Sequence, residues 1–174
     1  MTESRTDPKP RTLDSTIGAI ATLLAQPHAA GLKAELRRMR EGDVDCSAFW
    51  KIAVRHLADE LEGPEENVSD RERRWGVILS TLASMPHRHR PGRRLGAAMA
   101  EAGVSEARVL KLLRARGSAV PDTFRAVCHQ LETASQPVDW SELAHLILSE
   151  GRSDEERVRR RIARAYYRSI GGNS

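Results

Sequence analysis

The stretch RRLGAAMAEAGVSEARVLKLLRARG, residues 93–117, decides the fold class. Two runs of apolar residues recur in it at the three- and four-residue spacing of an amphipathic helix, and a glycine follows each run. Ser105, a residue type that often caps helices, separates the runs. The stretch therefore predicts two short helices joined by a tight turn. The first run holds Leu95, Ala98 and Met99, and the second holds Val109, Leu110, Leu112 and Leu113.

The same helical pattern continues outward in both directions, and strand signals are nearly absent. We therefore predict an all-α fold of about nine helices in two packed helical halves. Residues 1–13 are polar and contain prolines, so we expect a disordered tail there. The segment 86–92 holds two prolines and a glycine, which predicts a loop with fixed turns. It is the candidate joint between an N-terminal half, 14–92, and a C-terminal half, 93–174.

Length and composition exclude several classes of protein. The 174 residues are 40% apolar and 30% charged, which is typical of a globular protein. No apolar stretch approaches the roughly 18 residues of a membrane span, and the N-terminus lacks the apolar region of a signal peptide. We expect no membrane association and a cytoplasmic location. The two cysteines, Cys46 and Cys128, are far apart in sequence, so neither a disulfide framework nor a cysteine-based zinc site is expected.

No catalytic, metal or cofactor site is predicted. The chain contains no nucleophile elbow, no phosphate-binding P-loop and no zinc-protease motif. His87 and His89 form an HxH pair, but no second pair of ligands follows at a usual spacing. We expect this pair to belong to a solvated or phosphate-facing loop, and we expect both cysteines to be inert.

The charge is unevenly distributed along the chain. Net charge is +4, and 24 of the 28 basic residues are arginine. Residues 86–116 have a net charge of +6 and residues 151–174 one of +4, whereas residues 117–150 have a net charge of −4. Separate basic blocks favour a polyanionic partner. Arginine bias alone is weak evidence, because GC-rich genomes also prefer this residue.

Three predicted helices each place basic residues on one side. Spacings of three and four residues along a helix can follow a phosphate backbone, although any surface helix has charge opposite its buried face. In the last helix, Glu155 and Glu156 could pair with arginines one turn away, so its arginines stay outside the predicted site. The three sets are Arg108, Lys111 and Arg114; Lys33, Arg37 and Arg40; and Arg157, Arg161, Arg164 and Arg168.

The aromatic residues are expected in the core. Phe49, Trp50, Trp75, Phe124 and Trp140 all lie on apolar faces of predicted helices. Few aromatic rings then remain to stack on bases, and no base-reading module is evident. We therefore expect binding to the nucleic-acid backbone and shape rather than to base sequence.

In their order along the chain, several segments resemble the CasB family, the small subunits of the type I-E CRISPR Cascade complex. The resemblance covers most of residues 31–170. Its most specific part is the LG-x₅-AG-x-SE-x-RV-x-x-LL-x-AR pattern at 95–116. The other matching segments are LKAELRRM, SAFWKIAVRHL, PVDWSELAHLIL and RRRIARAYY.

The resemblance implies an all-α protein without enzymatic activity or cofactor. It implies partners, namely other Cascade subunits, guide RNA, target DNA and a second copy of the chain, and a basic surface that holds the target or displaced strand. The family's basic positions correspond here to Arg37, Arg38, Arg108, Arg114, Arg125 and Arg152. Helical geometry and charge add Arg88, Arg90, Arg93, Arg94, Lys111 and Arg116 to the predicted nucleic-acid site.

Two other functions stay open at this point. One is a helical adaptor whose basic faces meet acidic protein surfaces. The other is a stand-alone nucleic-acid-binding protein. Salt-dependent binding to random single strands separates the adaptor from the Cascade subunit, and a sequence preference above about 1–3 kcal/mol per base pair favours a stand-alone regulator.

Overall fold

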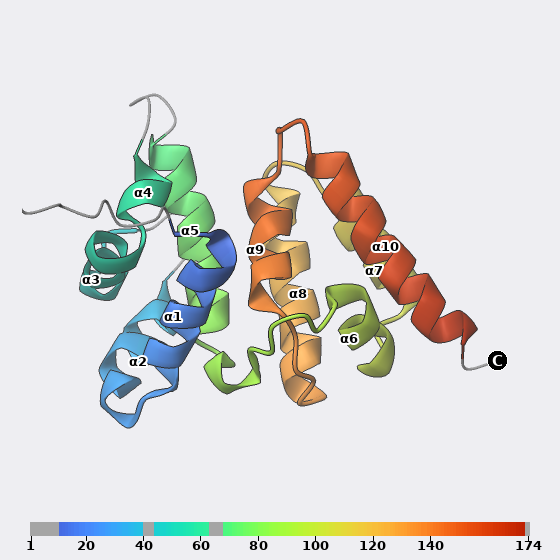
Figure 1. Ribbon diagram of the computed structural model, residues 1–174, viewed down its shortest axis with the longest axis horizontal. Helices are drawn as coiled ribbons and strands as arrows, with labels where there is room; N and C mark the ends of the chain where they lie inside the picture. Colours follow the sequence, from blue (N-terminus) through green and yellow to red (C-terminus); the bar gives the residue numbers. More distant parts are fainter. Residues whose placement is uncertain (1–10, 40–43, 63–67, 173–174) are drawn as a thin grey trace, which may run out of the picture.

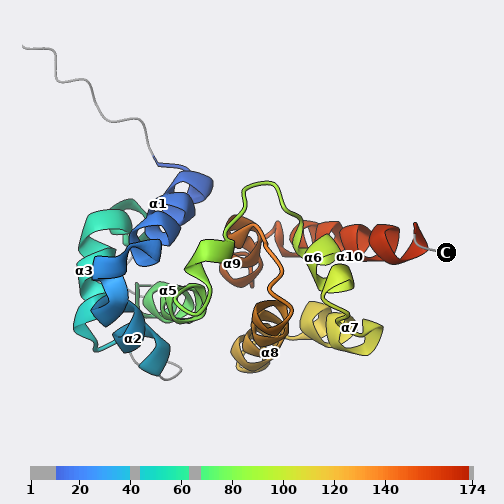
Figure 2. The same cartoon turned by 90° about the horizontal axis from the view of Figure 1, so that it is seen from below.

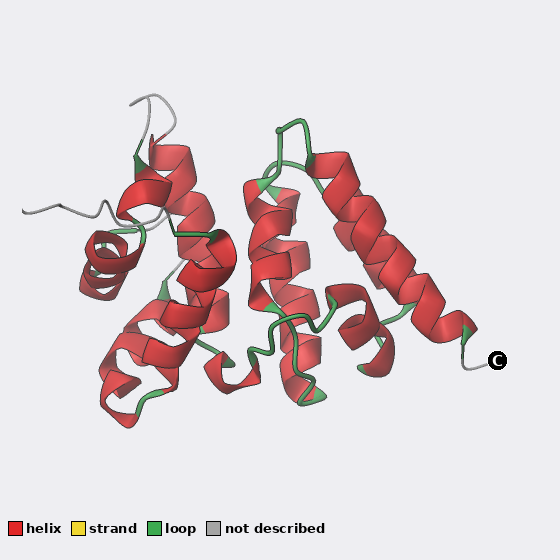
Figure 3. Ribbon diagram, in the orientation of Figure 1, coloured by secondary structure: helices red, strands yellow, loops and turns green. Residues whose placement is uncertain are grey.

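The computed structural model describes residues 11–39, 44–62 and 68–172. Within these ranges the chain is helical, with one isolated bridge between His89 and Val138 and no strand, so the all-α prediction is confirmed (Figure 3). No described helix is long and apolar enough to cross a membrane. The α-helices are α1 (Leu13–Ala25), α2 (Ala30–Arg38), α3 (Ser47–His56), α4 (Ala58–Leu61), α5 (Val68–Leu82), α6 (Leu95–Glu101), α7 (Glu106–Arg114), α8 (Ala119–Thr133), α9 (Trp140–Leu148) and α10 (Glu155–Gly171); the 3₁₀ helices are η1 (Pro27–Ala29) and η3 (Pro86–Arg88).

The predicted tail, residues 1–13, lies almost entirely outside the described residues. Helix α1 begins at Leu13, and the Thr12 side chain caps it by accepting a hydrogen bond from the Ser15 N–H at 3.3 Å. A threonine at this position satisfies one of the free amide groups at a helix start. The helix therefore begins slightly earlier than the sequence pattern indicates.

Helices α1 to α5 gather on one side of the molecule and α6 to α10 on the other (Figures 1 and 2). Helices α1 and α5 contact α9, and α5 also contacts α8. The buried apolar side chains form a single cluster that continues through both groups. Its largest fully buried members are Trp75, Trp140, Phe49 and Phe124, as the apolar faces predict.

The segment from Pro86 to Arg94 crosses between the two groups and is tied to the start of α9. Arg90 N–H donates to the Val138 carbonyl at 3.0 Å, and Val138 N–H donates to the Arg88 carbonyl at 3.0 Å. Gly92 N–H donates to the carboxylate of Asp139 at 2.7 Å. Beyond the single turn of η3, a segment with two prolines forms few helical hydrogen bonds of its own, so these bonds to the residues just before α9 hold it in place.

The apolar residues of 47–61 have the spacing of one continuous helix, but the structure divides this stretch into α3 and α4. At the division, Leu57 has φ −118° and ψ 12°, outside helical geometry. In a continuous helix Leu57 would lie seven residues after Trp50 and therefore on the same side, which is partly exposed. The break instead turns Leu57 inward, where its side chain is fully buried.

One expectation for the aromatic residues is wrong. Trp50 is 42% exposed, and Val54, one turn further along α3, is 79% exposed. Helix α3 lies at the edge of the molecule, where it packs mainly against α1, α2 and α4. Because neighbouring helices cover α3 on one side alone, only the apolar residues that face them are buried, and Trp50 and Val54 stay outside the core.

Candidate nucleic-acid interface

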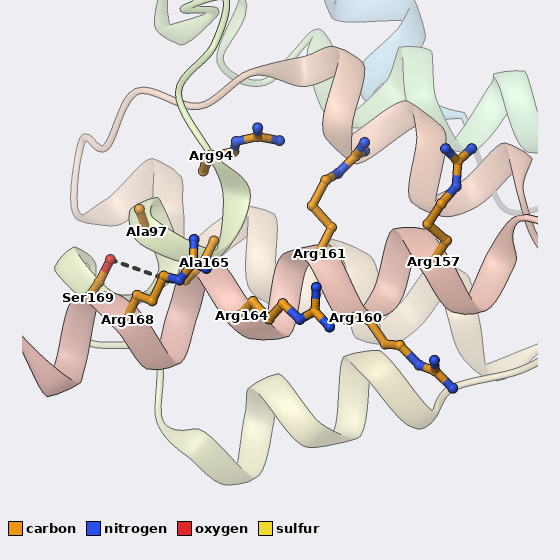
Figure 4. Close-up of a pocket in the computed structure, with 9 residues that line it drawn as sticks. All are labelled: Arg94, Ala97, Arg157, Arg160, Arg161, Arg164, Ala165, Arg168 and Ser169. Carbon is orange, nitrogen blue, oxygen red and sulfur yellow. Dashed lines mark hydrogen bonds between the residues drawn. The ribbon is translucent and has the colours of Figure 1, made fainter.

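Six arginines line an open groove of about 690 Å³ along α10, and no carboxylate is among the lining residues. Five of them project from α10, and Arg94 comes from the segment before α6 (Figure 4). Figure 4 shows Arg157 and Arg161 pointing to one side of α10 and Arg160 to the other. We call this surface the arginine groove. Its arginines are Arg94, Arg157, Arg160, Arg161, Arg164 and Arg168.

The buried side of α10 sets the direction of these arginines. Val158, Ile162 and Tyr166 recur every four residues and are buried, and the Tyr166 hydroxyl donates to the Val104 carbonyl at 2.7 Å. Helix α6 packs along α10, and Gly96 makes the close approach possible. Because one side of α10 is anchored in this way, Arg157, Arg160, Arg164 and Arg168 face outward, whereas Arg159 is buried beside Val158 and points toward α7.

The arginines of the groove fall into two electrostatic groups. The buried carboxylate of Glu142 lies 3.3 Å from Arg94 Nη1 and 3.1 Å from Arg161 Nε, and Asp154 lies 3.8 Å from Arg157 Nη2. The described part of the chain offers no ion-pair partner to the other three, which are exposed. These three, Arg160, Arg164 and Arg168, leave the groove with a strong excess of positive charge.

The acidic residues at the start of α10 do not neutralise the groove. Glu155 pairs with Arg159 at 2.9 Å, as the one-turn spacing predicts, and with Arg116 at 2.8 Å. Glu156 pairs with Arg116 at 2.8 Å. Burial acts to raise the pKa of Glu155, but the Gly151 N–H and the two guanidinium groups lower it overall. These carboxylates therefore hold α7 to α10, and Arg116 belongs to this structural network.

The basic side of α7 has the orientation predicted from its spacing. Val109 and Leu112 are buried, whereas Arg108, Lys111 and Arg114 are exposed. Arg108 donates to the side-chain oxygen of Gln130 on α8 at 2.7 Å. Lys111 and Arg114 border a groove of about 520 Å³ between α7 and the start of α8.

The basic segment 88–94 is only partly free to bind phosphate. Arg88 and Arg90 are exposed, and the described residues give their side chains no ion pair. Arg93 pairs with Glu101, and Arg94 pairs with Glu142. Of the four arginines in this segment, the structure therefore brings Arg94 alone to the arginine groove.

The structure brings Arg37 and Arg125 together in a cleft of about 200 Å³ bordered by α2, α5 and α8. Arg37 Nε donates to the Ala83 carbonyl at 2.9 Å and Nη2 to the Ser84 carbonyl at 3.2 Å. These bonds occupy carbonyl groups just after α5, where a helix lacks its own donors. Arg38 is exposed at the end of α2.

Arg152 lies in a different electrostatic setting. It lines a groove of about 660 Å³ together with five carboxylates. Burial and the neighbouring Asp59 raise the pKa of Glu60 in this groove, although Arg152 and His145 act in the opposite direction. Arg71 and Arg74 line the same groove, so its carboxylates outnumber its arginines by two and the balance of charge disfavours a phosphate. The carboxylates are Asp59, Glu60, Asp70, Glu150 and Asp154.

Of the HxH pair and the two cysteines, all but His87 have structural surroundings. His87 is exposed, and His89 Nδ1 accepts a hydrogen bond from the Trp140 N–H at 3.2 Å. Cys46 caps α3 by accepting from the Phe49 N–H, and burial raises the pKa of Cys128. In the described ranges, no three His, Cys, Asp or Glu side chains are grouped so that they could hold a metal ion.

The α10 arginines lie outside the site predicted from the sequence. Their signal was present, since Arg157, Arg161, Arg164 and Arg168 share one side of the last helix. The carboxylates of Glu155 and Glu156 were expected to neutralise them, but these pair mainly with Arg116 and Arg159. The pairing of Glu155 and Glu156 with Arg116 depends on the contact between α7 and α10, which the sequence alone does not show.

Comparison with known proteins connects the chain to one family. The family model of CRISPR-associated protein Cse2 matches residues 32–167. No curated protein matches the chain at a significant level. Solved structures of similar fold include CasB from M. ruber, with 20% identity and a TM-score of 0.68 over 93% of this chain and 96% of that one. CasB from Thermus thermophilus has 22% identity and a TM-score of 0.70 over 91% and 99%.

A third structure of similar fold comes from an assembly. A chain in a crystal structure of E. coli Cascade bound to a PAM-containing dsDNA target has 23% identity and a TM-score of 0.67, over 89% of this chain and 96% of that one. At such identities the likeness establishes the shared fold.

Proposed function

Because the chain belongs to the CRISPR-associated protein Cse2 family, we propose that it is a non-catalytic, nucleic-acid-binding subunit of a Cascade complex. In this role its basic helix faces hold the target or displaced DNA strand. Its partners are other Cascade subunits, a guide RNA with its target DNA, and a second copy of the chain. It acts in the cytoplasm.

The arginine groove is the observation that carries the proposal. It combines six guanidinium groups with an open surface and no lining carboxylate. From Arg157 to Arg168 the helix rises about 16 Å, so the cations can follow several phosphates in succession. Cations with this reach contact the backbone regardless of base sequence, which suits a subunit that must accept any target.

The arrangement supports binding rather than catalysis. In the described residues, His89 and Cys46 make structural contacts, and no carboxylate lines the arginine groove. We expect the purified protein neither to cut nucleic acid nor to hydrolyse ATP, with or without divalent metal. Metal-dependent cleavage that persists through repurification and disappears when His87 and His89 are replaced would contradict this part of the proposal.

A salt titration tests the binding. Affinity for mixed-sequence single-stranded DNA is measured at several salt concentrations for the wild type and for the R160A/R164A/R168A variant. Each lost phosphate contact should flatten the plot of log affinity against log salt by roughly 0.7. Exposed substitutions change stability by about 0.5 kcal/mol or less, so the melting temperature should stay close to that of the wild type.

A single pair of variants controls for overall charge. R164A removes a cation from the arginine groove, and R73A removes an exposed arginine from α5. Equal losses of affinity would mean that net charge alone binds DNA and would overturn the assignment of the groove. A lower slope in R164A alone supports it.

A second experiment tests the assembly. Co-expression with the neighbouring Cascade subunits and a guide RNA should yield a complex that contains this chain, and the triple variant should assemble while its target-DNA affinity falls. A chain that never co-purifies with these subunits but binds random single strands would be a stand-alone binding protein. A chain that binds acidic proteins and no nucleic acid would be an adaptor.

A further inference from the structure

The outer side of α3 combines exposed apolar and basic side chains. Trp50 is 42% exposed and Val54 is 79% exposed, and Lys51 and Arg55 are exposed beside them. Their positions along the helix place all four on one continuous side, which we call the α3 outer face. The sequence of α3 contains no acidic residue, and the carboxylate nearest its start, Glu35 of α2, accepts from the Ser47 N–H at 2.8 Å and interacts electrostatically with Lys51.

The ring of Trp50 is held in position from below. Phe49 is fully buried, and its ring meets that of Trp50 edge to face, with centroids 5.2 Å apart and planes at 88°. This contact limits the motion of the indole while much of its surface stays open. A platform that is already ordered loses less entropy when a ligand stacks on it.

The size of the α3 outer face indicates what covers it. A stable protein interface buries roughly 800 Å² on each partner, far more apolar area than one part-exposed Trp and one Val provide. One or two bases are a better match. Stacking on a Trp ring suits any base, because every base has a π-face, and adjacent cations can neutralise the phosphates that accompany it.

We propose that Trp50 stacks on a base of single-stranded nucleic acid whose phosphates contact Lys51 and Arg55. This inference rests on the proposed function and adds a second contact to it. Helices α3 and α10 lie at opposite ends of the molecule (Figures 1 and 2), so this contact is separate from the arginine groove. It also differs in kind, since it uses the bases as well as the backbone.

Tryptophan fluorescence reports on this contact directly. The chain has three tryptophans, and Trp75 and Trp140 are fully buried, so an added ligand reaches the ring of Trp50 alone. Mixed-sequence single-stranded DNA should quench the emission of the full-length protein. An abasic strand of equal length, which has the phosphates without the bases, should bind with little quenching. The W50F variant should show no ligand-dependent quenching.

Affinity measurements separate the two contacts. W50A should bind single-stranded DNA about fivefold or more weakly, because stacking on an aromatic ring contributes at least that factor. Its plot of log affinity against log salt should shift in parallel, since the side chain carries no charge. W50F keeps an aromatic ring and should recover most of the affinity. The arginine-groove variant R160A/R164A/R168A should instead change the slope and leave the quenching of Trp50 in place.

The possible outcomes are distinct. DNA that binds with a normal salt dependence but leaves Trp50 emission unchanged would overturn the stacking proposal and preserve the proposed function. Equal quenching by the abasic strand would also overturn it. Loss of Trp50 exposure only when a protein subunit is added would assign the α3 outer face to protein contact instead. Two results together support it: DNA quenches the emission whereas the abasic strand does not, and W50F keeps most of the affinity that W50A loses.

Discussion

Gly96 of α6 lies directly against the backbone of α10 at Ile162. A Cβ on Gly96 would overlap the Ile162 carbonyl oxygen and the Tyr166 amide nitrogen, which are backbone atoms that cannot rotate away. This contact sets the distance between α6 and α10. Since Arg94 immediately precedes α6, it also sets how Arg94 meets the arginines of α10.

Substitution of Gly96 by alanine should destabilise the protein. Overpacking a close helix contact costs about 1–3 kcal/mol, and here the neighbouring atoms are backbone. Gly31 provides the control, because a Cβ there meets nothing within 4 Å. G31A should leave the protein unchanged or up to about 1 kcal/mol more stable, as alanine is preferred in helices. Denaturant unfolding of both variants checks this, and equal stabilities would contradict the close contact.

Glu142 joins three elements. Its carboxylate accepts from the Leu95 N–H at 2.5 Å and pairs with Arg94 and Arg161. We expect the E142Q substitution to lower the free energy of unfolding by about 1–3 kcal/mol, because the guanidinium groups lose their buried negative partner. The loss stays below the 3–5 kcal/mol of a fully buried pair, because Arg94 is 57% and Arg161 39% exposed. E156Q, with an exposed carboxylate, should change stability by about 0.5 kcal/mol or less in the same unfolding assay.

The basic side of α7 gives a third prediction. The R108A/K111A/R114A variant should melt close to the wild type, because all three side chains are exposed. If they contact a strand, the slope of log affinity against log salt should fall by roughly 0.7 per lost contact for single-stranded DNA. An unchanged slope in a folded variant would make this side a solvated surface. L112A is the control for a packed position on the same helix. It truncates a buried side chain and should lower the free energy of unfolding by about 2–5 kcal/mol.

Stability should fall in mild acid through His89. Partial burial lowers its pKa from the ordinary 6.5, although Asp139 and Asp14 oppose the shift. The unfolded chain then binds a proton at a higher pH than the folded chain does, so stability rises with pH across this interval. The stability that neutral His89 contributes is fully present above about pH 6.5, and it is lost as the pH falls toward the lower pKa of His89 in the folded protein.

A histidine-to-asparagine variant isolates this effect. H89N keeps an oxygen that can accept from the Trp140 N–H but does not titrate. Unfolding free energies of the wild type and H89N are compared at pH values above and below the interval. As the pH falls, the unfolding free energy of the wild type should decrease more than that of H89N. A pH-independent difference would show that His89 does not contribute to the acid sensitivity.

The helices of this protein are determined by local sequence. Apolar residues at three- and four-residue spacing, with prolines and glycines between the runs, predict the all-α class and most helix positions. The exposed side of α7 also follows from its own spacing, because neighbours along one helix share a side wherever that helix packs.

Tertiary packing decided which charges stay free and which apolar residues stay exposed. Glu155 and Glu156 reach Arg116 only because α7 lies beside α10, and that contact leaves the α10 arginines to form a groove with Arg94. Trp50 has the spacing of a core residue, yet α3 is covered on one side alone. The physical reason is the same in both cases: periodicity describes the order of faces around one helix, whereas burial and ion pairing depend on which other helix meets each face.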